Sequence, residues 1–271
     1  MHRLGIVNFI NTAPLLIPFL EMGALDQWEI EEGSPAMLNR KLKAGQIHAG
    51  LISSFSYGQH FKDYFLLGDY CISATGTVGS VLLFSRKPIY DLFSSRIVLT
   101  NQSETSINLL FIILEYFNGF QPRYVSGTFH DFESDSQADA YLAIGDEALR
   151  LNRARGNFFT YDLASIWYET TSLPFVFAVW AVRKDSGLRD SPALEILKAR
   201  LDQSYQKGAM RLDEIAGKVC SRIPMPQGEC LSYLKGIEYD LSSLKIRGLT
   251  NFFRLLMQMG KIAAIPEVIE I

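Results

Sequence analysis

The stretch LGIVNFINTAPLL, residues 4–16, decides the fold, because it joins a buried strand to a helix through a polar turn. Residues 4–9 are mostly apolar and predict the strand. Pro14 suits the first turn of a helix that extends to about Met22, since proline lacks the backbone N–H group that a helix start leaves unpaired. Asn11 and Thr12 stand in the turn between the two elements.

The same alternation continues along the chain. Residues 28–32 form a short candidate strand. Ser34 as N-cap and Pro35 in the first turn predict a helix that ends at Gly45, and residues 48–53 return as a strand. This β-α-β-α-β order is typical of α/β domains with a parallel sheet.

A second set of elements follows. Strands are expected at residues 78–84, 96–100, 140–144 and 175–182, a buried helix at 107–116, and mostly helices from Pro192 onward with a break at 223–228. No linker is visible, and one lobe inserted into another would need none. We therefore expect two α/β lobes, residues 1–86 with 182–271 and residues 87–181. The chain would cross between them at 84–88 and 175–183, and a small ligand would bind in the cleft.

Composition narrows the class of protein. The chain has 271 residues, 48% of them hydrophobic, and a formal net charge of -3, which gives no reason to expect a nucleic-acid partner. Three cysteines without a CxxC pair and four scattered histidines predict neither a zinc site nor another metal site. The apolar N-terminal stretch is interrupted by polar residues and followed by no cleavage site, and no stretch is long enough for a membrane span, so we expect a cytoplasmic protein. The oligomeric state stays open.

Polar residues follow three of the expected strands, where open α/β sheets bind their ligands. These residues are Asn11, then Ser53 and Ser54, then Ser103, Thr105 and Ser106. The third group indicates a neutral anion site, because hydroxyls and free N–H groups at a helix start attract a carboxylate. Ordinary helix caps and turns explain the same residue types without a ligand.

Two further candidates are weaker on sequence alone. Ser80 is polar within an otherwise apolar strand, so its hydroxyl needs a partner, either the backbone or a ligand. Gly145 and Asp146 stand at a strand-to-helix junction, where an acidic residue also favours the helix dipole. No phosphate loop, GxSxG or HExxH motif is present. The candidates are thus mostly neutral, which suits anion binding, or chemistry in which the substrate supplies its own acid or base.

Six blocks, in this order and spacing, resemble the signature blocks of the chorismate dehydratase family of the futalosine route to menaquinone. They are residues 7–15 (VNFINTAPL), 51–54 (LISS), 76–86 (GTVGSVLLFSR), 99–106 (LTNQSETS), 144–149 (IGDEAL) and 173–183 (LPFVFAVWAVR). The resemblance implies a type II periplasmic-binding-protein-like fold and dehydration of chorismate to 3-[(1-carboxyvinyl)oxy]benzoate with no cofactor. The family's key asparagine falls on Asn11 and its key serine on Ser80.

On this resemblance Ser103, Thr105 and Ser106 would hold a substrate carboxylate, while Asn11 and Ser80 would orient the substrate and assist departure of its hydroxyl. Two positions depart from the family pattern. Ser56 stands where an acidic residue is common, and Ser172 where glycine is common, which affects the expected cleft shape.

Two rival functions share the expected fold. A 1,4-dihydroxy-6-naphthoate synthase-like enzyme would carry a Ser-Pro-x-Pro-Asn-Asp-like block near the N-terminus, which is absent. A non-catalytic solute-binding protein for small carboxylates would carry an export signal, yet the same cleft of neutral hydroxyls would serve it.

Overall fold

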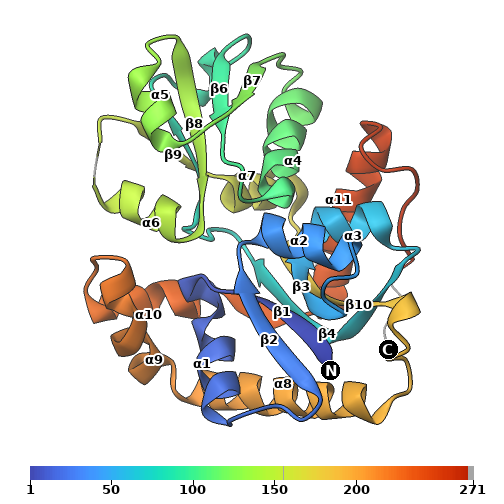
Figure 1. Ribbon diagram of the computed structural model, residues 1–271. Helices are drawn as coiled ribbons and strands as arrows, with labels where there is room; N and C mark the ends of the chain where they lie inside the picture. Colours follow the sequence, from blue (N-terminus) through green and yellow to red (C-terminus); the bar gives the residue numbers. More distant parts are fainter. Residues whose placement is uncertain (155, 268–271) are drawn as a thin grey trace.

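The computed structural model describes residues 1–154 and 156–267 and arranges them as two α/β lobes (Figure 1). The first lobe contains a six-stranded sheet of order β11-β4-β10-β3-β1-β2, and the second a five-stranded sheet of order β7-β6-β8-β5-β9. Helices pack on both sheets, which confirms the expected two-lobed α/β architecture.

The strands of the first sheet are β1 (His2–Val7), β2 (Trp28–Gly33), β3 (Ala49–Ser53), β4 (Tyr64–Ala74), β10 (Phe175–Arg183) and β11 (Glu238–Asp240). Its helices are η1 (Ile10–Thr12), α1 (Ala13–Glu21), α2 (Pro35–Lys43), α3 (Ser54–His60), η4 (Lys184–Ser186), α8 (Pro192–Met210), α9 (Leu212–Val219), η5 (Cys220–Arg222), α10 (Gln227–Lys235) and α11 (Ser243–Gln258). The expected helical C-terminal part is therefore confirmed, with the short strand β11 inserted in it.

The second sheet consists of β5 (Val81–Ser85), β6 (Arg96–Leu99), β7 (Arg123–Ser126), β8 (Ala138–Ile144) and β9 (Phe159–Asp162). Its helices are η2 (Ile89–Asp91), α4 (Glu104–Phe111) with its π-helical continuation η3 (Ile112–Phe117), α5 (Phe129–Ser134), α6 (Gly145–Arg153) and α7 (Leu163–Thr171).

The N-terminal elements form as the sequence predicts. β1 pairs in parallel with both β2 and β3, so the connecting helices α1 and α2 must cross over the sheet. Pro14 lies in the first turn of α1, and Ser34 caps α2 by accepting the N–H of Met37 at 3.4 Å. β10 returns antiparallel between β3 and β4.

The position of β5 shows that the expected crossing point between the lobes was wrong. It pairs with β8 and β9 of the second sheet, although the expected division gave residues 1–86 to the first lobe. The chain therefore first crosses between Ala74 and Val81, upstream of residues 84–88. Val78 and Gly79 donate their N–H groups to the Asp162 carboxylate at 3.1 and 2.6 Å, so the strand begins only after this crossing loop. β10 lies wholly in the first sheet, which puts the return before Phe175.

The main hydrophobic cluster extends through both lobes, from Leu4 and Leu51 in the first to Leu83 and Ile97 in the second. A separate cluster joins α9 and α10 to Ile10 of the first turn. The C-terminal helices are thus packed against the residues that follow β1. None of the helices in the described residues is long and apolar enough to cross a membrane.

Candidate active site

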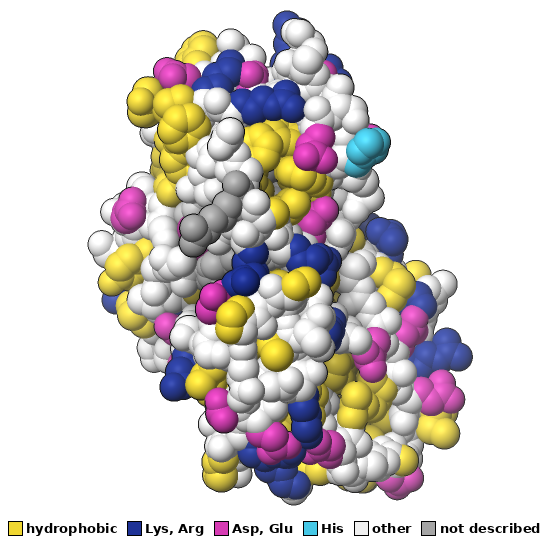
Figure 2. Space-filling model, turned by 90° about the vertical axis from the view of Figure 1, so that its left-hand side faces the viewer, with side chains coloured by type: hydrophobic (Ala, Val, Ile, Leu, Met, Phe, Trp, Pro, Cys, Tyr) yellow, Lys and Arg dark blue, Asp and Glu magenta, His cyan; other side chains and the backbone are white. Residues whose placement is uncertain are grey.

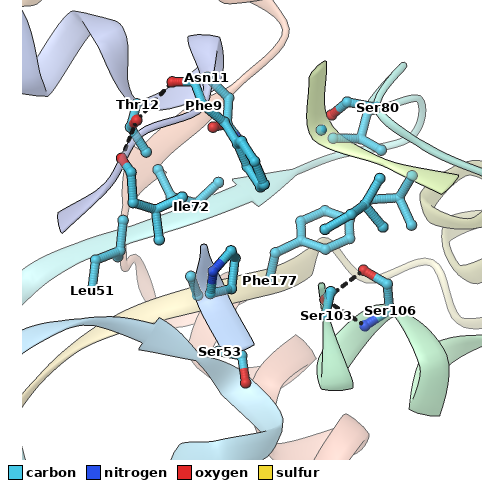
Figure 3. A pocket seen from close by; sticks show the side chains of 17 residues that line it. Phe9, Asn11, Thr12, Leu51, Ser53, Ile72, Ser80, Ser103, Ser106 and Phe177 are labelled. Atoms are coloured by element: carbon cyan, nitrogen blue, oxygen red, sulfur yellow. Dashed lines mark hydrogen bonds between the residues drawn. The ribbon is translucent and has the colours of Figure 1, made fainter. Parts of the chain in front are cut away.

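A cavity that is partly open to solvent lies between the two lobes, and its empty space, open solvent included, is ≈ 540 Å³. Both lobes and the crossing loop contribute to its wall (Figure 3). The lining residues are Val7, Phe9, Asn11, Thr12, Pro35, Leu51, Ser53, Ile72, Val78, Ser80, Val81, Ser103, Ser106, Ile144, Gly145, Phe177 and Ala178.

Most residues predicted from the sequence lie on this wall: Asn11, Ser53, Ser80, Ser103, Ser106 and Gly145. Ser54, Thr105 and Asp146 lie behind it. Ser54 Oγ donates to the carbonyl of Val176 at 2.7 Å, and Thr105 Oγ accepts the N–H of Phe55 at 2.9 Å. Their hydroxyls hold the wall in place, so the structure gives them no direct access to a ligand.

Asn11 lies in η1, the turn between β1 and α1. The Thr12 hydroxyl fixes this turn by donating to the carbonyl oxygens of Val7 and Phe9 at 2.5 and 2.7 Å (Figure 3). The side-chain oxygen of Asn11 is buried and has no hydrogen-bond partner among the described residues. A buried acceptor that no protein group satisfies takes its donor from outside the protein, and Asn11 lines the cavity, so a ligand donor would fit this position.

Ser80 lies at the end of the crossing loop and is 2% exposed. Its hydroxyl oxygen accepts a hydrogen bond from the Tyr233 hydroxyl at 3.0 Å, and its carbonyl accepts the N–H of Gly145 at 2.7 Å. The partner of this buried hydroxyl is therefore a tyrosine of α10, which the sequence did not suggest. Burial raises the pKa of Tyr233 well above its usual value, so the phenol stays protonated.

The start of α4 carries two serines that face the cavity. Ser103 caps the helix by accepting the N–H of Ser106 at 3.2 Å, and its own proton goes to Ser106 Oγ at 3.0 Å (Figure 3). The proton of Ser106 then points to no protein partner among the described residues. The predicted cap is confirmed, and anion binding at this helix start stays a prediction.

Ser53 has a similar place at the start of α3. Its hydroxyl oxygen accepts the N–H of Ser56 at 3.2 Å and the side-chain amide of Asn39 at 2.9 Å. Ser56, one of the two departures from the family pattern, does not line the cavity. Neither does the other departure, Ser172, which ends α7 in a left-handed conformation with φ of 56°.

Apolar side chains form the rest of the wall, and the rings of Phe9 and Phe177 extend among the polar groups in Figure 3. Among the described residues, none of the lining side chains is charged. Phe177 lies at an irregularity in the pairing of β10 with β4, between Val176 and Ala178. Such a bulge redirects a side chain. Sequence reasoning missed Phe177, because the apolar run 175–182 contains no sign of a bulge.

Gly145 shapes the wall through its lack of a side chain. Its φ is +58°, and a Cβ atom there would lie 2.9 Å from the ring of Phe9. Asp146, the next residue, accepts the N–H of Ile10 at 2.9 Å and pairs with Arg222 at 3.2 Å. Asp146 thus ties the turn that carries Asn11 to the second lobe.

Further polar contacts join the lobes beside the cavity. Asn39 of α2 donates to Glu104 of α4 at 2.8 Å, and on the opposite side Arg153 of α6 pairs with Glu229 of α10. Figure 2 shows basic side chains gathered where the lobes meet on that face. Within residues 1–154 and 156–267, no three His, Cys, Asp or Glu side chains gather as they would around a metal ion.

The sequence matches known proteins over nearly its whole length. A family model described as menaquinone biosynthesis matches residues 2–258. The chain is 32% identical over 266 residues to chorismate dehydratase of Thermus thermophilus, and the match covers 93% of each chain.

Three solved structures share the fold at low sequence identity. A protein of Archaeoglobus fulgidus matches with a TM-score of 0.78 and 18% identity, covering 96% of this chain and 98% of that one. The alkanesulfonate-binding protein of Xanthomonas axonopodis pv. citri matches with a TM-score of 0.69 and 15% identity, covering 99% and 95%. The periplasmic aliphatic sulphonate-binding protein of Escherichia coli has a TM-score of 0.66 and 13% identity, covering 98% and 90%.

These structures confirm a periplasmic-binding-protein-like fold and say nothing more specific, because their identity is so low. The family is shown by the sequence matches, which span nearly the whole chain. The protein therefore belongs to the chorismate dehydratase family of menaquinone biosynthesis.

Proposed function

We propose that this protein is a chorismate dehydratase, a hydro-lyase that converts chorismate to 3-[(1-carboxyvinyl)oxy]benzoate and water. The 32% identical relative from Thermus thermophilus supports the activity. The observation that carries the proposal is the buried oxygen of Asn11, which has no partner among the described residues, in a cavity whose described lining side chains are uncharged. Such a site offers directed hydrogen bonds to a small polar molecule, and its apolar walls pack against a ring.

The reaction removes one water and makes the ring aromatic. The C–H bond breaks at the ring carbon that bears the enolpyruvyl ether, and its electron pair enters the ring. The C–O bond of the neighbouring hydroxyl breaks, and the hydroxide takes up the released proton to leave as water. The reaction needs no second reactant, and it involves no net oxidation or reduction.

The polar groups of the cavity have separate roles in this proposal. Ser103, Ser106 and the free N–H groups at the start of α4 hold the ring carboxylate, where negative charge spreads as the proton leaves. Asn11 accepts a hydrogen bond from the substrate and so sets its orientation. Ser80 directs its proton at the departing hydroxyl.

The base in this proposal is the enolpyruvyl carboxylate of the substrate itself. None of the described lining residues has a carboxylate, imidazole or amine that would accept the proton. The apolar wall around Phe9 and Phe177 removes water from a bound carboxylate, which raises its basicity. The protein then contributes position and electrostatic stabilisation.

The first test is incubation of the purified protein with chorismate after treatment with a chelator, followed by mass and ultraviolet spectra. A product lighter by one water with an aromatic spectrum is the expected result. If chorismate remained unchanged while raising the melting temperature of the protein, the chain would instead act as a carboxylate-binding protein.

A further inference from the structure

Tyr233 contacts the cavity residue Ser80 from a part of the chain outside every block that carried the family resemblance. It belongs to α10, and its hydroxyl donates to Ser80 Oγ at 3.0 Å. Its ring packs against the crossing loop, because a Cβ atom on Gly79 would lie 3.6 Å from it. The contact therefore links the C-terminal helices to the residue expected to act on the leaving hydroxyl.

The elements that hold Tyr233 are well anchored. Its neighbours Cys230 and Leu234 are buried in the cluster that joins α9 and α10 to Ile10. Tyr239, a few residues farther along, donates its hydroxyl to the carbonyl of Asn11 at 2.8 Å. The same C-terminal segment thus contacts both residues to which the family pattern gives a key role.

The hydrogen-bond inventory of Ser80 shows what the contact does. A serine hydroxyl has one proton and two lone pairs. Among the described residues, Tyr233 is the only partner of Ser80 Oγ, and it acts as donor. The tyrosine occupies a lone pair, so the serine cannot turn its own proton toward the phenol without losing this bond. The proton of Ser80 is left for the cavity that the residue lines.

We propose that Tyr233 is a positioning residue for the dehydration, which holds the Ser80 hydroxyl with its proton directed at the leaving hydroxyl of the substrate. This inference rests on the proposed function. Tyr233 does not line the cavity and acts through Ser80 alone.

The test is the variant Tyr233→Phe, which keeps the ring and removes only the hydroxyl. Loss of one positioning hydrogen bond should lower kcat about tenfold while KM changes by less than about twofold. The matched control is Tyr141→Phe, which removes a buried hydroxyl bonded to Glu147 at 2.9 Å in the second lobe and should leave kcat unchanged.

A double-mutant cycle distinguishes positioning from a structural role. If Tyr233 acts through Ser80, then Tyr233→Phe should have no further effect on kcat once Ser80→Ala is present. Independent, multiplying effects of the two substitutions would overturn the inference, as would full kcat in Tyr233→Phe when Ser80→Ala is impaired. A wild-type protein that does not dehydrate chorismate would overturn the proposed function, and this inference with it.

Discussion

At the scale of single residues, Asn11 has a side-chain oxygen whose hydrogen bond a bound ligand would supply. Its buried oxygen has no hydrogen-bond partner among the described residues, a desolvation cost that a donor from outside the protein must offset. Natural sites often retain such a cost because activity requires the group. In the proposed function Asn11 is such a group, because its oxygen accepts a hydrogen bond from the substrate.

Asn11→Ala should lower kcat roughly a hundredfold, the size of effect seen when one hydrogen-bonding group of a reaction site is lost. The melting temperature should stay level or rise, because an unpaired buried oxygen is removed. Steady-state kinetics and thermal unfolding check both parts. Asn118→Ala is the control: Asn118 donates to the carbonyl of Ile113 at 2.6 Å and does not line the cavity, so this variant should lose stability and keep kcat. Full activity of Asn11→Ala would remove Asn11 from the reaction.

Ser172 departs from the family pattern, and we expect this departure to lower the stability of the fold. It ends α7 with φ of 56°, a conformation that glycine adopts freely and other residues adopt with strain. Ser172→Gly should therefore raise the free energy of unfolding by up to about 1 kcal/mol. Ser172→Ala keeps the strain and should give no gain. Chemical denaturation of the three proteins tests this, and equal effects of glycine and alanine would contradict it.

At the scale of helices and strands, the sequence predicts the elements whose signals are local. Pro14 and Ser34 mark the starts of α1 and α2, and the structure confirms both. Ser103 marks the start of α4, although the sequence placed the helix itself a few residues later, at 107–116. Caps and first-turn prolines are readable because they act within three or four residues of chain.

Elements that depend on distant partners were not predictable in the same way. β4 was not expected at all, and β5 was expected three residues too early and in the other lobe. The start of β5 depends on the hydrogen bonds between the crossing loop and Asp162, which is far away in the sequence. The same applies to Tyr233 and Phe177, whose places in the site depend on tertiary packing and on a bulge.

The junction of α1 with α9 gives a prediction on pH. Glu21 at the end of α1 accepts hydrogen bonds from Arg211 and Lys218, which lower its pKa from 4.5 to about 2. A carboxyl whose pKa is lower in the folded state stabilises that state above its unfolded pKa, and the gain disappears as the pH falls toward 2. The side chains are exposed, so the effect is small and screened by salt.

Thermal unfolding of the wild type and Glu21→Gln between pH 2 and 6, at low salt, tests this junction. The wild type should melt at the higher temperature near pH 6, and the difference should shrink from about pH 4.5 downward. Addition of salt at pH 6 should also reduce it. A difference that is constant over the whole pH range would mean that the glutamine disturbs packing and that the ion pairs contribute nothing.

At the scale of the whole molecule, two kinds of contact join the lobes around the cavity. Apolar packing continues between them in the main cluster, whereas polar contacts join them at α6 and at α4. Polar contacts at a partly exposed junction are weak and exchange readily with water. We therefore expect the lobes to separate on the polar sides to admit the substrate, and to close on it again.

Arg222 is the contact best suited to test this movement. Its guanidinium donates to Asn8 of the first lobe at 2.9 and 2.8 Å and to Asp146 of the second at 3.2 Å, and Asp146 in turn holds the turn that carries Asn11. Arg222→Ala should shift the free protein toward an open form without touching the cavity wall. Since substrate binding must then also drive closure, KM should rise about tenfold while kcat changes less.

Steady-state kinetics and small-angle X-ray scattering measure the two consequences of this substitution. The substrate-free variant should have a larger radius of gyration than the wild type, and saturating chorismate should restore the smaller value, because the ligand favours the closed form. Arg96→Ala removes an ion pair of 2.8 Å with Asp135 inside the second lobe and should change neither quantity. If Arg222→Ala kept the wild-type KM and radius, the lobes would be held together by the apolar cluster alone, and the substrate would enter through the part of the cavity already open to solvent.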